Sequence, residues 1–148
     1  MLPGGANDLV QALGGGGKDG GGLKAGATAI YAPKGGTGKT LLTVNLATVL
    51  RRQGSSVAVI DGVMQFGSVR HLLQVPPDAK SIVDLPPAGA MKMAMPEALW
   101  EGPGGVHYLL APSRPEQSEL VAATELTAAI NILSESHDHV IEIGRAHV

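Results

Sequence analysis

The chain has 148 residues, enough for one domain, and its formal net charge of −2 gives no global reason to expect nucleic-acid binding. It contains no cysteine, which excludes iron–sulfur clusters held by thiolates. No apolar run is long enough to span a membrane, and the N-terminus lacks the charged-then-apolar pattern of a signal peptide. The sequence therefore predicts a cytoplasmic protein.

The first 26 residues differ in composition from the rest of the chain. Residues 1–13 contain Leu9, Val10 and Leu13, which a short helix capped by Asn7 or Asp8 would carry. Residues 14–26 contain eight of the 21 glycines and predict a flexible linker. Two interpretations of residues 1–13 stay open, namely the remnant of a preceding domain and a disordered extension.

A glycine-rich turn joins the first predicted strand, residues 27–33, to the first predicted helix, residues 41–53. In this context, glycines let successive backbone N–H groups point at an anion, and the helix adds its positive end. Lys39 would reach the β- and γ-phosphates of a nucleotide, and the Thr40 hydroxyl would bind Mg²⁺. The turn that predicts this phosphate site reads Lys34, Gly35, Gly36, Thr37, Gly38, Lys39 and Thr40.

One departure from the usual phosphate-loop pattern is informative. Pro33 stands where that pattern has its first glycine, and a second lysine, Lys34, opens the loop instead. The stretch Lys34–Thr40 therefore resembles the deviant Walker A motif of the ParA/MinD superfamily of P-loop ATPases. The resemblance implies ATP and Mg²⁺ as cofactors, and a homodimer in which Lys34 crosses the interface to the partner's nucleotide. It also implies that Thr43 belongs to the nucleotide-binding set.

The second predicted strand, residues 56–61, is an apolar run that ends in Asp61, as expected of a buried parallel strand whose carboxyl end faces a site. Residues 61–67 resemble the switch segment of the CpaE/TadZ-like pilus-assembly branch, through Asp61 and Gln65-Phe66-Gly67. The resemblance implies that Asp61 is a catalytic and Mg²⁺-binding residue. Val63 replaces the second acid, and its side chain has no lone pair to hold a water, so nucleotide binding with weak hydrolysis is expected. The alternative for Asp61 is an acid that caps the next turn.

The middle of the chain predicts little regular structure. Residues 67–73 predict a short helix on which His71 is a surface residue rather than a metal ligand. Two Pro-Pro pairs bracket residues 81–85, in a layout that again resembles the CpaE branch. The alternating Met91, Met93 and Met95 are interpreted as core filler on an irregular segment, with an adaptable partner surface as the alternative.

The last third of the chain predicts a turn at 102–105, a third strand at 106–111 and one long helix from Pro115 to about Glu135. The turn Ala111–Glu116 resembles a family turn near the nucleotide, which implies that Arg114 serves the base or the dimer interface; a solvated arginine is the alternative. The residues expected to face inward from the helix are Leu120, Val121, Leu126, Ala129, Ile130 and Leu133.

A fourth strand is expected to begin at His139. In the family this strand ends in the Walker B aspartate, two residues before a proline, and no such pair follows here. Residues 142–148 instead match one reading frame of a common sequencing adapter, so residues 143–148 are expected to be a non-native tail. The sequence therefore predicts an α/β P-loop domain, a parallel sheet flanked by helices, of which residues 27–142 are the N-terminal part.

The resemblance implies an ATP-binding dimer that localises or regulates pilus-assembly or secretion machinery, and residues 1–13 then correspond to the end of a receiver-like domain. Its expected location is the cytoplasm, at a pole or peripherally at the inner membrane face. Three alternatives stay open. They are a ParA/MinD-type ATPase acting on DNA or membrane, a metabolic synthetase on the same fold, and a degenerate chain without activity.

Overall fold

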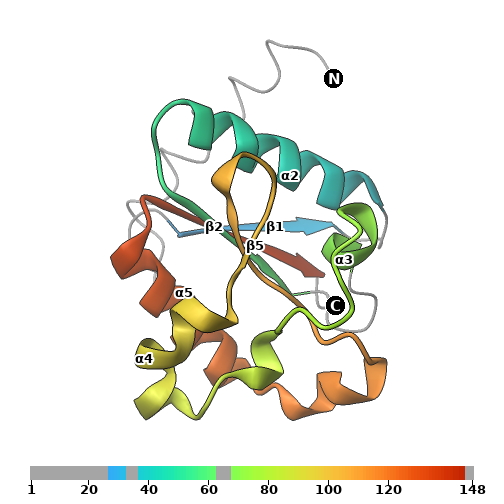
Figure 1. Ribbon diagram of the computed structural model, residues 1–148, viewed down its shortest axis with the longest axis vertical. Coiled ribbons are helices and arrows are strands. Elements are labelled where there is room, and N and C mark those ends of the chain that lie inside the picture. The colour runs from blue at the N-terminus through green and yellow to red at the C-terminus, as the bar shows by residue number, and fades with distance from the viewer. Residues whose placement is uncertain (1–26, 33–36, 63–67, 146–148) are drawn as a thin grey trace.

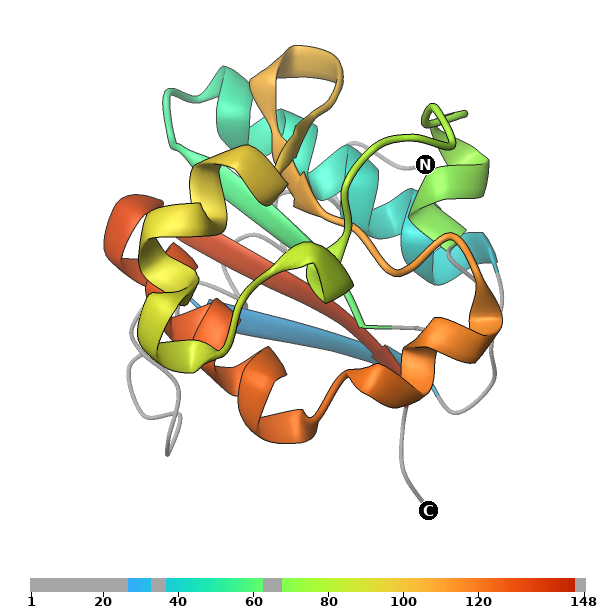
Figure 2. The ribbon, with the colours of Figure 1, turned by 60° about the horizontal axis from the view of Figure 1, so that its bottom comes forward.

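The computed structural model describes residues 27–32, 37–62 and 68–145. These residues form a three-layer α/β/α arrangement in which a central sheet lies between α2 on one face and α4 and α5 on the other (Figures 1 and 2). The elements in chain order are β1 (Ala27–Ala32), α2 (Thr37–Arg52), β2 (Val57–Asp61), α3 (Ser68–Leu72), η1 (Ile82–Asp84), α4 (Ala88–Ala98), β3 (Trp100–Glu101), η2 (Pro103–Gly105), β4 (His107–Leu109), η3 (Pro115–Leu120), α5 (Ala123–Ser136) and β5 (His139–Arg145).

The sheet has the strand order β1-β5-β2-β4-β3. Strands β1, β5, β2 and β4 are parallel, whereas β3 pairs antiparallel with β4. The predicted α/β class, with a parallel sheet flanked by helices, is thus confirmed, and one short antiparallel strand, β3, is added at the edge of the sheet. The turn between β3 and β4 reverses the chain tightly, and Gly104 and Gly105 adopt positive φ angles of 75° and 88° that other residues rarely take.

Alternating side chains of β2 divide the core into two layers. Val57 and Val59 face α2, whereas Ala58 and Ile60 face α4 and α5. This is the pattern of a strand that is covered on both faces, which explains the continuous apolar run in the sequence.

Helix α2 begins at Thr37, four residues before the predicted start, so the end of the glycine-rich motif is itself helical. It ends at Arg52, within one residue of the predicted end, and Gly54 takes a φ of +97° just beyond it. Leu46, Ala47 and Leu50 are buried against the sheet, but Leu41 is half exposed.

The methionine-rich segment is a helix, α4, and the prediction of an irregular segment was wrong. Met91 and Met95 lie four residues apart on one face and are buried, with exposed fractions of 0% and 3%, whereas Met93 is 92% exposed. The interpretation as core filler is confirmed for two of the three methionines. The spacing of four residues between Met91 and Met95 indicates one face of a helix, whereas the alternation of methionines through Met93 does not.

The single helix predicted from Pro115 to Glu135 is also wrong, because two elements occupy this stretch. The 3₁₀ segment η3 ends at Leu120, and α5 begins at Ala123 after a break. Leu120, which was expected to face inward, is 67% exposed, whereas Ala129, Ile130 and Leu133 are buried as predicted.

Strand β5 begins at His139, as predicted, and runs to Arg145, so it includes residues 143–145, which were expected to belong to the tail. It lies between β1 and β2 and pairs with both, with Thr28 and Val59 flanking Ile141.

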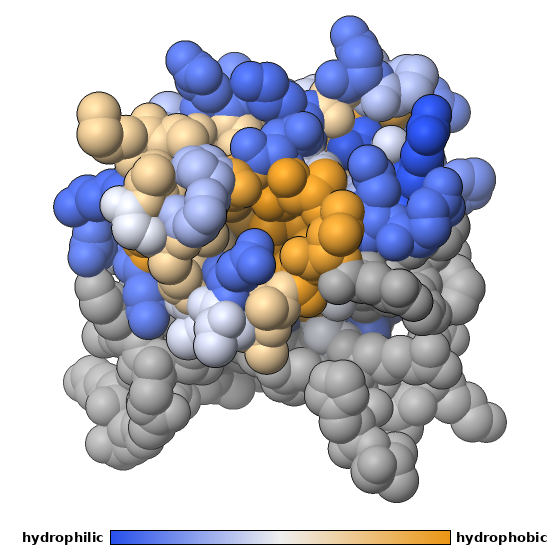
Figure 3. Space-filling model, turned by 90° about the horizontal axis from the view of Figure 1, so that it is seen from below, coloured by the Kyte–Doolittle hydropathy of each residue, from blue (hydrophilic) through white to orange (hydrophobic). Residues whose placement is uncertain are grey.

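Seen from below Figure 1, the surface carries an area of apolar residues bordered by hydrophilic ones (Figure 3). The large apolar side chains that are exposed in the described part of the chain are Leu41, Leu72, Met93 and Leu120. None of the described helices is both long and apolar enough to cross a membrane.

Candidate functional site

The carboxyl ends of the parallel strands gather the predicted site residues at one edge of the sheet. The N-terminus of α2 lies at this same edge, beside the ends of β1 and β5 (Figure 1). In an open α/β sheet, ligands bind outside the carboxyl ends of the strands, where helix N-termini supply N–H donors and positive potential. The predicted phosphate site therefore lies where such a fold binds a ligand.

Residues of the first turns of α2 provide a cation and two hydroxyl groups. Lys39 is half-buried, and its Nζ donates a hydrogen bond to the carbonyl of Gly144 at the end of β5. Thr40 and Thr43 are buried, and the Thr43 hydroxyl donates to the Lys39 carbonyl at 2.9 Å. This bond fixes Thr43 within its own helix, so Lys39 and Thr40 are the two α2 side chains that fit a phosphate and its metal ion.

Asp61 ends β2 and is 1% exposed. Its Oδ2 accepts a hydrogen bond from the Val69 N–H at 3.2 Å, which ties the N-terminus of α3 to the end of the strand. The next residue, Gly62, donates its N–H to the Ile143 carbonyl at 2.7 Å, and a Cβ at this position would lie 2.5 Å from that oxygen. Glycine is therefore required at position 62. The bond to Val69 also accords with the alternative in which Asp61 caps the following turn.

Several predicted residues lie outside the described part of the chain. These are Lys34, Gly35 and Gly36 of the loop and residues 63–67 of the switch segment, including Val63. Thr37 is described only as the first residue of α2.

Arg70 is a residue of this edge that the sequence interpretation missed. Its Nε donates to the Ala111 carbonyl at 2.8 Å and its Nη2 to the Ala79 carbonyl at 2.9 Å. Burial lowers the pKa of the Arg70 guanidinium, and the charges of Asp84 and Asp61 oppose this shift. Arg70 thus connects α3 with the segment before η1 and with the loop after β4. Its position three residues beyond the switch segment was the available signal.

The remaining predicted residues are exposed. Arg114 lies in the loop after β4, as expected, and its side chain is exposed; His71 is on the surface of α3, also as expected. Among the described residues, no three His, Asp or Glu side chains are grouped so that they could hold a metal ion. A metal at this edge would therefore need oxygen atoms from a ligand in addition to protein side chains.

The residues that are present fit a nucleotide with Mg²⁺. A Cβ added to Gly38 would meet nothing within 4 Å, so there is open space at the first turn of α2. Lys39 supplies positive charge, and the Thr40 hydroxyl and the Asp61 carboxylate are the oxygen donors that Mg²⁺ prefers. Mg²⁺ is commonly held by few protein groups together with the phosphates of its nucleotide, so Thr40 and Asp61 are sufficient protein ligands for such an ion.

Comparison with known families decides which fold family this is. The model of the CobQ/CobB/MinD/ParA nucleotide binding domain matches residues 28–133. The chain belongs to this family. The match covers β1, the phosphate-loop motif, β2 and most of α5, so the sequence interpretation of the superfamily is confirmed.

Similar proteins are consistent with this membership. An uncharacterised ATP-binding protein of Methanocaldococcus jannaschii is 36% identical over 84 residues, which is 57% of this chain and 31% of that protein. The BceF tyrosine kinase domain superposes with a TM-score of 0.73 at 26% identity, covering 95% of this chain and 54% of the other. Cobyrinic acid a,c-diamide synthase from Mycobacterium smegmatis, solved with an ATP analogue and magnesium, gives 0.60 at 25% identity, covering 79% and 48%. The chain thus spans about half the length of these solved proteins, and less of the curated relative.

Proposed function

We propose that this family member binds ATP with Mg²⁺ at the carboxyl edge of the sheet and acts as a nucleotide-dependent switch. The observation that carries the proposal is the placement of Lys39 and Thr40 on the first turns of α2 at the same edge as the buried Asp61. Lys39 and the loop amides would hold the phosphates, and Thr40 and Asp61 would hold Mg²⁺. The relative solved with an ATP analogue and magnesium supports this choice of ligands.

Hydrolysis is proposed to be weak. An acid at position 63 would accept a hydrogen bond from the attacking water and orient it, whereas the Val63 side chain has no acceptor. A protein that binds ATP but turns it over slowly would stay in its ATP-bound state for long periods.

The biological role that we propose is the localisation or regulation of pilus-assembly or secretion machinery by an ATP-dependent homodimer. It is supported by the resemblance of Gln65-Phe66-Gly67 and of the Pro-Pro layout to the CpaE/TadZ-like branch, and by Lys34, which would contact the partner's nucleotide. The proposed location is the cytoplasm, at a pole or at the inner membrane face. A second candidate is a partitioning or division-site ATPase, since the matching family model includes MinD and ParA.

The first experiment measures ATP binding by isothermal titration calorimetry with Mg²⁺ present. Lys39→Ala should weaken binding about a hundredfold or more, because it removes the cation that faces the phosphates. Lys80→Ala, at an exposed lysine outside the site, is the matched control and should bind like the parent chain. Equal affinities of Lys39→Ala and the parent would overturn the phosphate assignment.

Two further variants test the finer parts of the proposal. Val63→Asp should raise the steady-state rate of ATP hydrolysis, and a parent rate that is already as high as that of the variant would refute weak hydrolysis. Lys34→Ala should abolish ATP-dependent dimers in size-exclusion chromatography while ATP still binds the monomer. A dimer that forms without ATP, or that survives Lys34→Ala, would contradict the proposed role of Lys34.

A further inference from the structure

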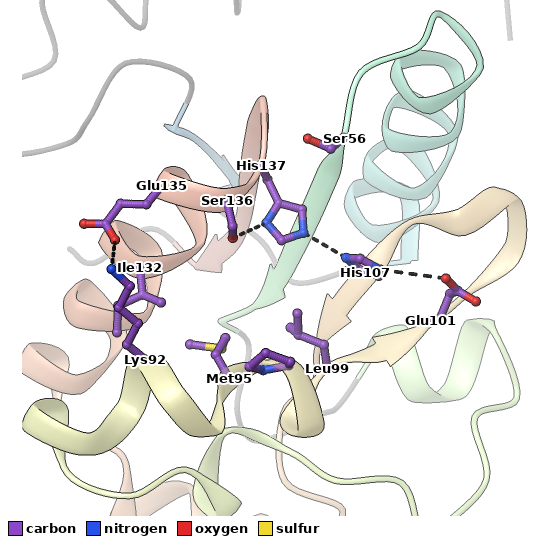
Figure 4. Close-up of a pocket in the computed structure, with 11 residues that line it drawn as sticks. Ser56, Lys92, Met95, Leu99, Glu101, His107, Ile132, Glu135, Ser136 and His137 are labelled. Carbon is purple, nitrogen blue, oxygen red and sulfur yellow. Dashed lines mark hydrogen bonds and ion pairs between the residues drawn. The ribbon is translucent and has the colours of Figure 1, made fainter.

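A pocket of about 760 Å³ lies at the opposite edge of the sheet from Lys39. It opens where Ser56 precedes β2 and His107 begins β4, between α4 and the C-terminal end of α5 (Figure 4). The apolar part of its wall consists of Met95, Leu99 and Ile132. The volume of the pocket is in the range of pockets that bind small molecules. Nothing in the nucleotide proposal uses this pocket.

Hydrogen bonds determine which nitrogen atoms carry protons in the histidine pair of the pocket. His137 Nδ1 lies 3.1 Å from the Leu133 carbonyl, which can only accept, and 2.9 Å from the Ser136 hydroxyl, which itself donates to that carbonyl at 3.3 Å, so Nδ1 carries the proton. In the neutral ring, His137 Nε2 is then an acceptor, and it lies 2.8 Å from His107 Nδ1, which must donate. Burial lowers the pKa of His137 and so favours this neutral form. In a neutral His107, Nε2 is consequently an acceptor.

When both histidines are neutral, two hydrogen-bond acceptors lie side by side at the rim of the pocket. His107 Nε2 and Glu101 Oε1 are 3.8 Å apart, too far for a hydrogen bond between them, and both come from the β3–β4 hairpin (Figure 4). A donor with more than one N–H can bridge them, and a positive charge on that donor would be stabilised by the carboxylate.

The other charged groups of the pocket favour a cation over an anion. The ammonium of Lys92 is paired with Glu135 at 3.1 Å, on the far side of the pocket from His107 (Figure 4). The carboxylate of Asp138, next to His137, accepts a hydrogen bond from the Ser56 N–H at 2.9 Å. The lysine that lines the pocket is thus already paired with a carboxylate, whereas no lysine or arginine among the lining residues lies beside Glu101.

We propose that this pocket binds an organic cation, a primary amine on an alkyl or aryl body. The ammonium group lies between Glu101 and His107, and the apolar body packs on Met95, Leu99 and Ile132. Both a free amine and the lysine side chain of a peptide have this chemistry.

The test is a titration of the whole chain with 2-phenylethylamine, followed by NMR of the histidine rings and by calorimetry. 2-Phenylethanol, which lacks the charge, should bind at least about tenfold more weakly. Glu101→Gln should weaken binding of the amine about fivefold or more, because the exposed side chain keeps its shape and loses its charge. Glu97→Gln removes an exposed carboxylate of α4 that does not line the pocket, and it should bind the amine like the parent.

A parallel titration with the peptide acetyl-Leu-Lys-Leu-amide distinguishes the two sources. Binding of the amine alone assigns the site to a small molecule, and binding of the peptide alone assigns it to a lysine side chain. Absence of binding by both up to about 10 mM overturns the proposal, since affinities weaker than this correspond to less than about 3 kcal/mol. Equal binding of amine and alcohol, or unchanged binding by Glu101→Gln, overturns it as well.

Discussion

The buried hydroxyl of Tyr108 offers a sharp test of the packing in the sheet. Tyr108 lies in β4 with an exposed fraction of 1%, and its ring packs on Trp100 with centroids 5.9 Å apart. Its hydroxyl is buried without a hydrogen-bond partner among the described residues. Burial raises the pKa of Tyr108 to about 12 from the ordinary value of 10.0. Tyr108→Phe removes this hydroxyl and leaves the ring.

Two magnitudes follow for Tyr108→Phe. Near pH 7 the variant no longer buries an unsatisfied polar group, so its free energy of unfolding should rise by about 1 kcal/mol. Above pH 10 the unfolded parent chain loses the phenolic proton while the folded chain keeps it, so the stability of the parent falls as pH rises from about 10 to 12. At about pH 11 this loss amounts to about 1.4 kcal/mol, and the variant does not share it.

The assay is urea denaturation of both proteins near pH 7 and near pH 11. The comparison cancels the titration of lysines and of the other tyrosine, Tyr31, because both proteins contain them. Absorbance of the tyrosinate ion gives the same pKa independently. A variant that is less stable by about 1 kcal/mol near pH 7, with the same loss as the parent near pH 11, would show that the hydroxyl has a partner and would refute the reasoning.

Three further predictions concern other parts of the fold. Met91→Ala should lower the free energy of unfolding by about 2–4 kcal/mol, because Met91 is fully buried. Met93→Ala should change it by less than about 0.5 kcal/mol, because Met93 is exposed. Equal effects of the two substitutions in urea denaturation would contradict the assignment of the α4 faces. Burial lowers the pKa of His137, so the folded state favours the neutral ring and stability should fall as pH drops below about 6.5. In urea denaturation between about pH 7.5 and 5, His137→Gln should reduce this loss of stability, and the control His71→Gln should leave it unchanged. If the stability of His137→Gln falls with pH as steeply as that of the parent, His137 is not the cause of the loss. Arg70→Met should lower the free energy of unfolding by about 1–3 kcal/mol, because it leaves the carbonyls of Ala111 and Ala79 without their donor. A variant with the same midpoint of thermal unfolding as the parent would contradict this.

The elements that the sequence predicted correctly are those with a local physical cause. The helix after the glycine-rich turn ends at Arg52 because Gly54 takes a positive φ, and β2 is buried along its whole length because its apolar run admits no other environment. The motif likewise placed Lys39 and Thr40 at a strand–helix junction, where a phosphate site requires them. Local propensity and the hydrophobic pattern agree in these segments.

The predictions that failed depended on contacts with distant residues. The methionine-rich segment became a helix because Met91 and Met95 pack into the core beside Ile130 and Leu133 of α5, which are nearly forty residues away. The long helix after Pro115 was broken before Ala123, and Leu120 was left exposed, although its pattern suits a helix. The local sequence does not show which residues of a segment will be buried against distant parts of the chain and which will lie beyond the core.

The sequence by itself determined the α/β class and the superfamily, because each depends on residue types at fixed spacing, and it predicted the phosphate-loop residues on the same grounds. Only the tertiary structure brought Asp61 of β2 and Lys39 of α2 to one edge, connected Arg70 to Ala111, and joined His107 to His137 at the other edge. These pairs lie far apart in the chain or on different elements, and the order of strands in the sheet decides which of them meet. Strand order results from packing of the whole domain, which no single stretch of sequence encodes.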